Sequence, residues 1–273
     1  MTRARTRLAA GTLTAALLGL AAGCGAVTGD ETETATVGAP QPNLLEHGEL
    51  SVCTDMPYEP FEFEKKDGTP AGFDVDLVRH VADRLGVELR MVDTNFDDIA
   101  SGDSLNNGKC DLAISAMTIT GERARVLNFS SPYFDAAQAM VVNTGSGISK
   151  LGDLVGGRIG VQGGTTGELY LTDHAPDDAK VVPFEDAAAM DAAMKKGDVD
   201  AAVYDNTVVG DVVKANKDLE VAAEFDTGEQ YGMAVRRNGN VELLQVVNDV
   251  LADLKQDGTY DEIYTEWFGK TGT

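Results

Sequence analysis

From residue 44 onward, apolar runs of strand length alternate with amphipathic helical patterns. The first repeat is the clearest: residues 50–55 have the composition of a strand, and residues 73–85 place their apolar side chains on one helical face that ends before Gly86. Strands that alternate with helices are typical of parallel sheets, because a parallel connection has to cross the sheet and usually does so as a helix. We therefore predict an α/β fold with mainly parallel strands.

The alternation continues to the end of the chain. Residues 241–255 repeat apolar side chains at helical spacing before Gly258, and residues 260–268 form a second, shorter helical pattern. Further strands are predicted at residues 87–92, 110–116, 158–161, 181–184 and 199–204. With 43% hydrophobic residues, the chain can bury a substantial core.

The charge balance excludes one class of partner. Acidic residues outnumber basic ones by 45 to 22, which gives a formal net charge of -23 at pH 7. A surface that binds phosphate backbones needs the opposite sign, so we expect no nucleic-acid partner. No apolar run reaches the roughly 20 residues that a helix needs to cross a bilayer, so we expect no membrane-spanning segment.

The first 23 residues have the order of an export signal: basic residues, then an apolar stretch, then small residues. The stretch ends in LAAGC at residues 20–24, which is similar to a bacterial lipobox, where lipid is attached to the cysteine that starts the mature chain. Ala21 departs from that pattern, since leucine is more usual there. We predict lipidation of Cys24 and anchoring at the outer face of a membrane; the alternative is a plain signal peptide with Cys24 incidental.

Residues 24–43 are rich in Thr, Gly, Pro and acid and have almost no large apolar side chains. Such a segment cannot bury enough surface to order itself, so we predict a flexible tether. The predicted organisation is therefore a lipoprotein signal peptide at 1–23, a tether at 24–43, and a folded part from residue 44.

Signals for enzyme chemistry are weak. None of the three histidines, His47, His80 and His174, has metal-ligand spacing to another His or Cys. Neither the G-x-G-x-x-G pattern of dinucleotide sites nor the G-x-S-x-G pattern of serine hydrolases occurs. We expect no metal, no cofactor and no catalytic residues.

Three segments together resemble the bacterial extracytoplasmic solute-binding proteins of family 3, which deliver polar amino acids to ABC importers. The first is TDMPYEPFEF at 54–63 with GFDVDL at 72–77. The second is SAMTITGER at 115–123 with FSSPYF at 129–134, and the third is GVQGGTTG at 160–167 with Asp205. Their order and spacing cover nearly all of the chain after residue 44.

The resemblance implies a two-lobed periplasmic-binding-protein-like fold of type II, in which each lobe is a mainly parallel sheet flanked by helices. The first lobe would comprise residues 44–134 and 232–273, the second residues 135–231, and a two-stranded hinge would join them. One amino acid would be captured as the lobes close, and a monomer would deliver it to permease and ATPase subunits. Two separate sets of strands in the sequence agree with two sheets, and ligands bind beyond the carboxyl ends of such strands.

The resemblance also implies how the two charges of an amino acid are compensated, which burial makes necessary. Arg123 would bind the α-carboxylate through two parallel hydrogen bonds, helped by the hydroxyl of Thr118 and the backbone of Ala116. Alternatively, Arg123 is a surface arginine paired with Glu122. Asp205 would hold the α-ammonium; alternatively, it caps a helix that begins near Asn206.

Two threonines and two aromatic residues complete the family pattern. Thr165 and Thr166 would point hydroxyls and helix N-terminal amides at the α-carboxylate, or would only cap the helix. Tyr58 and Phe96 match positions that sandwich the ligand side chain, and core packing is the alternative for both.

The ligand side chain would face Asp55 and Gln162. Asp55 can pair with a guanidinium or ammonium group, and the negative body of the protein would attract a cation. Gln162 suits a neutral amide, and Asp55 can accept an amide N–H as well. We predict a cationic amino acid, with a glutamine-selective protein as the alternative; arginine, lysine, histidine and glutamine all stay open.

Cys53 and Cys110 are the two thiols that remain after Cys24 in an exported chain, so they are candidates for a disulfide. Their strands, if aligned as parallel neighbours, would put Cys110 a few residues too low for the bond. Both possibilities stay open.

A dehydratase-like enzyme on the same scaffold is the rival function. It would need a catalytic acid or base such as Glu59 or Glu62, and we expect both to be exposed to solvent.

Overall fold

Two five-stranded sheets organise the part of the chain that the computed structural model describes, residues 42–269. Both sheets lie within one compact unit. The predicted signal peptide, Cys24 and all but the end of the tether lie outside the described residues. In the described part of the chain, no helix combines the length and the apolarity that crossing a bilayer requires.

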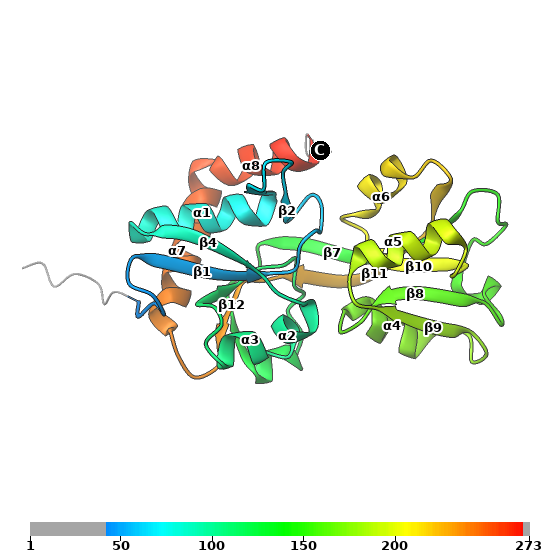
Figure 1. Cartoon of the computed structure of the whole chain (residues 1–273), viewed down its shortest axis with the longest axis horizontal. Coiled ribbons are helices and arrows are strands. Elements are labelled where there is room, and N and C mark those ends of the chain that lie inside the picture. Colours follow the sequence, from blue (N-terminus) through cyan, green and yellow to red (C-terminus); the bar gives the residue numbers. More distant parts are fainter. Residues whose placement is uncertain (1–41, 270–273) are drawn as a thin grey trace, which may run out of the picture. The chain divides into compact units, whose positions relative to one another are not determined.

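The first sheet has the strand order β4-β1-β5-β12-β6. β1 is parallel to both β4 and β5, whereas β12 is antiparallel to β5 and β6. Figure 1 shows α1 and α8 on one side of this sheet and α2 and α3 on the other. The strands are β1 (Glu49–Thr54), β4 (Glu88–Asp93), β5 (Leu112–Ala113), β6 (Leu127–Phe129) and β12 (Ala234–Arg236). The helices are α1 (Phe73–Leu85), α2 (Phe96–Ala100), α3 (Asp103–Asn106), α7 (Val241–Asp257) and α8 (Thr259–Phe268).

The second sheet has the order β11-β7-β10-β8-β9. β8 is parallel to β9 and β10, and β7 is antiparallel to β10 and β11. Its strands are β7 (Phe134–Asn143), β8 (Arg158–Gln162), β9 (Lys180–Phe184), β10 (Ala201–Asp205) and β11 (Leu219–Tyr231). Its helices are α4 (Thr166–His174), α5 (Ala187–Lys196) and α6 (Val209–Ala215). A small hairpin of β2 (Phe63–Glu64) and β3 (Pro70–Ala71) stands apart from both sheets.

Helix α1 and the parallel strands were predictable from local sequence patterns, whereas the antiparallel strands were not. Helix α1 begins and ends where predicted, and Gly86 follows it with φ +67°, a conformation that glycine adopts without strain. The α/β class is confirmed, but each sheet is mixed: its parallel half was predictable from strand–helix alternation, and its antiparallel half was not. β5 is shorter than the predicted strand at 110–116, because the chain bends before Leu112.

Two long antiparallel strands connect the sheets. β7 begins at Phe134 and β11 ends at Tyr231, and these two residues are register partners. The chain therefore enters and leaves the second sheet at one place, and we propose Phe134 and Tyr231 as the lobe boundaries. Phe61 lies at this crossing, with ring centroids 5.1 Å from Phe134, 5.5 Å from Tyr231 and 5.2 Å from Phe268. This aromatic packing ties the two strands to the first sheet.

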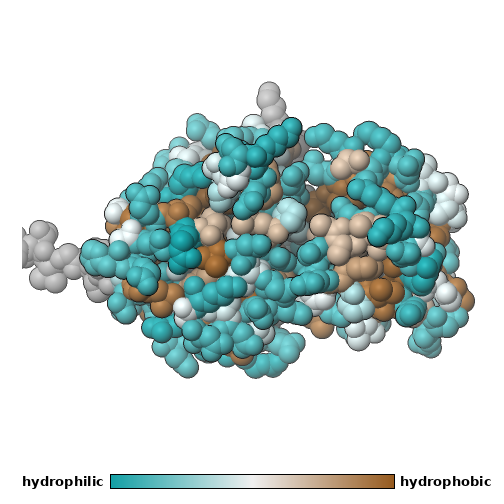
Figure 2. Space-filling model, in the orientation of Figure 1, coloured by the Kyte–Doolittle hydropathy of each residue, from teal (hydrophilic) through white to brown (hydrophobic). Residues whose placement is uncertain are grey.

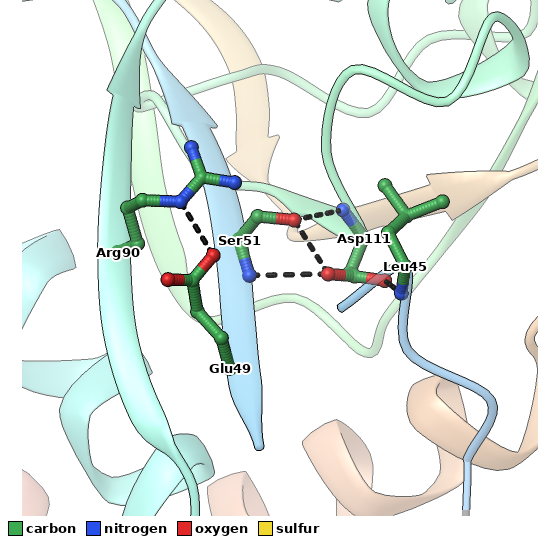
Figure 3. Close-up of polar contacts among 5 residues, drawn as sticks. All are labelled: Leu45, Glu49, Ser51, Arg90 and Asp111. Carbon is green, nitrogen blue, oxygen red and sulfur yellow. Dashed lines mark hydrogen bonds and ion pairs between the residues drawn. The ribbon is translucent and has the colours of Figure 1, made fainter. Parts of the chain in front are cut away.

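The start of the folded part is held by a buried aspartate. Asp111, which is 5% exposed, accepts hydrogen bonds from the backbone N–H of Leu45 at 2.7 Å and from that of Ser51 at 3.1 Å. The hydroxyl of Ser51 donates a third at 2.5 Å, as Figure 3 shows. The carboxylate thus fixes the segment ahead of β1 to the loop ahead of β5.

Cys53 and Cys110 form a disulfide, with 5.7 Å between their Cα atoms. The register argument against this bond was wrong. Cys53 is level with Ala113 in the parallel pair, but Cys110 precedes β5 and is not part of an extended strand, so the bent chain returns it to Cys53. The face of the molecule in Figure 2 is covered mostly by hydrophilic residues, as its acidic composition leads one to expect.

Candidate ligand-binding site

One pocket lies at the carboxyl ends of strands from both sheets. β1, β5, β8 and β10 all end beside it, which is the usual position for ligand sites in open α/β sheets. The residues predicted from the sequence all line it: Asp55, Tyr58, Phe96, Ala116, Thr118, Arg123, Gln162, Thr165, Thr166 and Asp205. Three segments that are far apart in the chain are therefore brought together.

Arg123 is the cation of the pocket. It lies in a short 3-10 helix at Arg123–Arg125 and is only 6% exposed, so it is not the surface arginine of the alternative interpretation. Its Nη1 donates to the carbonyl of Thr118 at 2.7 Å, and its Nη2 donates to the carbonyl of Gly164 at 3.0 Å. Burial lowers the pKa of Arg123 to about 10, against the opposing effect of Asp205 and Glu229. The guanidinium therefore stays charged at neutral pH.

Asp205 ends β10 and brings a carboxylate to the pocket that Arg123 also lines. Tyr231 donates to its Oδ2 at 2.5 Å, and Nε2 of Gln138 donates to its Oδ1 at 2.6 Å. Burial raises the pKa of Asp205 to about 6, although the hydrogen bond from Tyr231 acts to lower it. The helix that we predicted directly after Asp205 begins only at Val209, so Asp205 is not its cap.

Glu229, which sequence analysis missed, connects the threonines of the site. Its Oε2 accepts a hydrogen bond from the hydroxyl of Thr118 at 2.6 Å and another from that of Thr166 at 2.6 Å. Gln138 and Thr227 donate to its Oε1 at 3.0 and 2.8 Å. Burial acts to raise the pKa of Glu229, but these four hydrogen bonds outweigh it and the pKa is lowered. Glu229 is therefore ionised at neutral pH.

The threonines at the start of α4 have separate roles. Thr165 is the N-cap: its hydroxyl accepts from the backbone N–H of Glu168 at 3.3 Å and donates to the carbonyl of Gln162 at 2.8 Å. The hydroxyl of Thr166 lies 3.4 Å from that of Thr118. The capping role predicted as an alternative for Thr165 is therefore present, and the N-terminus of α4 faces the pocket.

Asp55 and Gln162 meet at another side of the pocket. Nε2 of Gln162 donates to Oδ2 of Asp55 at 2.7 Å. Burial raises the pKa of Asp55 to about 6; the hydrogen bond from Gln162 opposes this, and the negative charges of Asp93 and Asp186 add to it. No ion pair of the described residues involves Asp55.

The two predicted aromatic residues differ in their packing. Phe96 starts α2 and is 8% exposed. Cζ of Arg123 lies over its ring, 5.1 Å from the ring centroid, so the ring supports the guanidinium from one side. Tyr58 is half-buried and packs against a hydrophobic cluster that contains residues of both sheets, while it also lines the pocket. Core packing and pocket lining therefore coexist in both residues.

Five further residues line the pocket and were not predicted: Ser115, Gln138, Met190, Val203 and Tyr204. The signal for one of them was present, because Gln138 is a lone polar residue in the apolar run of β7 and is fully buried. Met190, Val203 and Tyr204 have the character of ordinary core residues. The expectation that Glu62 is exposed was wrong, since it is 0% exposed, whereas Glu59 is exposed.

The charge of the site is unbalanced. Of the residues that the structure describes, Arg123 is the one cationic side chain that lines the pocket, whereas Asp55 and Asp205 line it and Glu229 contacts its threonines. These groups carry a net charge of two negative units when all are ionised. Among the described residues, no group of three or more His, Cys, Asp or Glu side chains is arranged to hold a metal ion.

Comparison with known proteins identifies relatives over most of the chain. The family model described as bacterial extracellular solute-binding proteins, family 3, matches residues 50–270. The L-cystine-binding protein TcyJ of Escherichia coli (strain K12) is 34% identical over 229 residues, which are 83% of this chain and 85% of that protein. The ABC transporter arginine-binding protein 1 of the same strain is 35% identical over 216 residues, 77% of this chain and 87% of that protein.

A solved structure agrees with the fold. An ancestral arginine-binding protein bound to arginine is 42% identical, with a TM-score of 0.76 over 81% of this chain and 99% of that one. Another solved form of an ancestral arginine-binding protein is bound to glutamine. Two of these relatives are therefore named for cystine and for arginine, and one arginine-binding protein holds glutamine in a solved structure.

Proposed function

Since this chain belongs to the bacterial extracellular solute-binding proteins of family 3, we propose that it captures a cationic amino acid between two closing lobes and delivers it to the permease and ATPase subunits of an ABC importer. Relatives of the chain are amino-acid-binding proteins of ABC transporters. In this proposal the protein is a monomeric, non-enzymatic receptor.

The observation that carries the cationic assignment is the charge imbalance of the pocket. In the bound state, Arg123 pairs with the α-carboxylate and Asp205 with the α-ammonium, so a neutral zwitterion leaves two carboxylates uncompensated. A ligand with one additional positive charge reduces this excess, and removing a buried unpaired charge is worth several kcal/mol. Asp55 is available to pair with this additional positive charge, because no ion pair of the described residues involves it. Tyr58 offers its ring to the same cation.

The α-carboxylate site is supported by donors that still have capacity. Arg123 uses Nη1 and Nη2 each in one bond to a backbone carbonyl, and a guanidinium has five N–H groups in total. The N-terminus of α4 adds backbone amides beside Thr166. By contrast, the hydroxyls of Thr118 and Thr166 donate to Glu229, so in this arrangement they face the ligand as acceptors. We therefore assign them to the ligand's ammonium side rather than to its carboxylate.

A glutamine ligand is the second candidate, favoured by Gln162. A neutral side-chain amide can replace the amide of Gln162 at Asp55 and can return a hydrogen bond to Gln162 itself. A protein related at 41% identity is bound to glutamine in one solved structure. The two candidates make opposite demands on Asp55, because only a cation needs its negative charge.

The experiment starts with the purified protein and an equimolar pool of the natural amino acids. Mass spectrometry of the retained fraction identifies what stays bound and whether it is chemically altered, and titration calorimetry ranks arginine, lysine, histidine, glutamine and glutamate. Retention of unaltered arginine or lysine supports the proposal. Retention of glutamine alone would replace the ligand, and conversion of any pool member would overturn the receptor assignment.

Membrane attachment completes the proposal. The LAAGC pattern at residues 20–24 and the tether that follows support a lipid on Cys24, which would hold the receptor near its permease. A tether of about 20 residues extends at most roughly 70 Å, which is enough for the folded part to reach a membrane protein beside its anchor.

A further inference from the structure

Two acidic side chains lie buried behind the pocket and have no role in the function proposed above. Glu62 precedes the β2–β3 hairpin, and Asp74 is the second residue of α1. Both are 0% exposed. Among the described residues, neither takes part in an ion pair. A buried carboxylate without a cation is costly, so the arrangement requires an explanation.

Both carboxyl groups hold the segment that forms part of the pocket wall. The hydroxyl of Ser115 donates to Oε1 of Glu62 at 2.7 Å and accepts from the backbone N–H of Asp55 at 3.0 Å. The backbone N–H of Ala116 donates to Oδ2 of Asp74 at 2.8 Å. Ser115 and Ala116 both line the pocket. Glu62 and Asp74 therefore act on the site through this pair of residues.

Ala116 needs such support. Its φ of +42° lies in the left-handed region, where a residue with a Cβ atom is strained unless its surroundings hold it. The hydrogen bond to Asp74 fixes the backbone N–H at this position, and the hydroxyl of Tyr133 donates to the same oxygen of Asp74 at 2.9 Å. The shape of the pocket wall thus depends on Asp74 staying where it is.

One oxygen of each carboxyl group has no hydrogen-bond partner: Oε2 of Glu62 and Oδ1 of Asp74. The two groups lie within hydrogen-bonding reach of each other. Two ionised carboxylates would repel at this distance, and both unpartnered oxygens would remain buried. A single proton between them removes the repulsion and gives each oxygen a partner.

Within residues 42–269, the groups that face the pair offer no positive charge. Those that face it are Asp55 beside Ser115, Tyr58 from the loop after β1, Tyr133 ahead of β7 and Tyr260 from α8. Burial raises the pKa of Asp74 to about 7, although the hydrogen bonds from Ala116 and Tyr133 oppose it. Burial and then the negative charge of Asp74 hold the pKa of Glu62 well above its usual value.

We propose that Glu62 and Asp74 share one proton at neutral pH and together position Ser115 and Ala116, so that loss of this proton at alkaline pH distorts the pocket wall and weakens ligand binding. The first half of this inference stands on the buried pair alone. The second half rests on the proposed function, because it needs an amino acid in the pocket.

The proton itself is tested by infrared spectroscopy of the full folded chain at pH 7.5, without any ligand. A protonated carboxylic acid has a carbonyl stretch that an ionised carboxylate lacks. We expect this band in the wild type, its loss in the double variant Glu62→Gln, Asp74→Asn, which has neither carboxyl group to hold the proton, and its persistence in Asp55→Asn and Asp205→Asn, in which a different carboxyl group with a raised pKa is removed. Absence of the band in the wild type, or its loss only in the two control variants, overturns the shared proton.

The effect on binding is tested by calorimetric titration with L-arginine between pH 7 and 8.5. We expect the wild-type affinity to fall by up to about tenfold per pH unit above the apparent pKa of the pair. Glu62→Gln carries a permanent N–H donor toward Asp74, so its affinity should vary less with pH. Equal pH profiles in the wild type and in Glu62→Gln overturn the positioning role. If arginine does not bind at all, the cationic proposal fails, while the infrared result still decides the shared proton.

Discussion

Gln162 donates a hydrogen bond from Nε2 to Oδ2 of Asp55, with 2.7 Å between the two atoms. Asp55 directly follows β1 of the first sheet and Gln162 ends β8 of the second, so the bond crosses the pocket between the two sheets. The residue that suits a cationic ligand and the residue that suits an amide ligand are thus joined to each other. A ligand side chain that enters here has to replace this bond with one of its own.

Replacing Asp55 by Asn distinguishes the two ligand classes. If the ligand is cationic, Asp55→Asn removes the charge partner, and affinity should fall by roughly 1.5–3 kcal/mol, the value of a hydrogen bond to a charged group. Titration calorimetry with arginine and lysine measures this change. Gln162→Ala is the matched control, since it removes the other half of the bond and leaves the charge in place, and we expect it to retain cation binding. Tight glutamine binding that survives Asp55→Asn, without competition from arginine or lysine, would contradict the cationic assignment.

Residues at strand ends were predictable from the sequence because each follows a recognisable apolar run. Asp55, Thr118 and Asp205 stand next to such runs, so their place at one edge of the sheets followed from the fold class. Glu229 was not predictable in this way. It lies inside β11, a strand with alternating exposure and many charges, and its neighbours Thr118 and Thr166 are 111 and 63 residues away.

The burial of Glu62 could not be predicted from its neighbours in the sequence either. Local patterns assign Glu62 to an exposed loop, because an acid beside Glu64, Lys65 and Lys66 has the character of a surface residue. Its burial depends on α1 and on Ser115, which reach it from distant parts of the chain. The Cys53–Cys110 bond depended likewise on a bend before β5 that no periodicity revealed.

The proposed pairing of Arg123 with the α-carboxylate and of Asp205 with the α-ammonium predicts large losses of ligand affinity from single substitutions. Arg123→Ala or Asp205→Ala should each cost on the order of 3 kcal/mol or more in ligand affinity, because the opposite charge of the ligand is left buried and unpaired. Calorimetric titration gives the affinity, and circular dichroism checks that the fold is intact. Arg125→Ala is the control, since Arg125 follows in the same short helix and is exposed. Wild-type affinity in a folded Arg123 or Asp205 variant removes that residue from the site.

Membrane attachment is separable from binding. Cys24→Ser should leave folding and ligand affinity unchanged and should release the protein from the membrane fraction, because only the lipid acceptor is lost. Fractionation of expressing cells followed by immunoblotting measures the distribution. If the variant stays as membrane-bound as the wild type, another anchor is required and the lipobox interpretation is wrong.

The buried Asp111 predicts a loss of stability that does not affect binding. Asp111→Ala leaves the N–H groups of Leu45 and Ser51 without their acceptor, so we expect a loss of about 2–3 kcal/mol in the free energy of unfolding. Arg90→Ala is a control from the same region in Figure 3. It breaks the Arg90–Glu49 ion pair, which is exposed to solvent and should contribute less than about 1 kcal/mol. Urea denaturation compares the two; a smaller loss in Asp111→Ala than in Arg90→Ala contradicts the role of Asp111.

Acidification should weaken binding and stabilise the free protein, two opposite effects with one cause. Burial raises the pKa values of Asp55 and Asp205 to about 6, so both carboxylates are ionised at pH 7 and largely protonated at pH 5. Binding of a cation needs the ionised forms, and ligand affinity should therefore fall as the pH drops through 6. In the free protein the sign reverses. The folded state binds these protons more tightly than the unfolded chain, whose aspartates titrate near 3.9, so this stabilisation is complete below about pH 4 and is lost as the pH rises through 6.

Thermal unfolding of the ligand-free protein between pH 4 and 7 tests the second effect. The wild type should lose stability over this range relative to the double variant Asp55→Asn, Asp205→Asn, in which neither side chain titrates. Since both carboxyl groups are partly exposed to solvent, the difference should be about 1–2 kcal/mol rather than the full value of two such shifts. Calorimetry with arginine at pH 5 and pH 7 tests the first effect. Parallel pH profiles of stability in the wild type and the double variant would show that these two carboxyl groups are not the ones that titrate near pH 6.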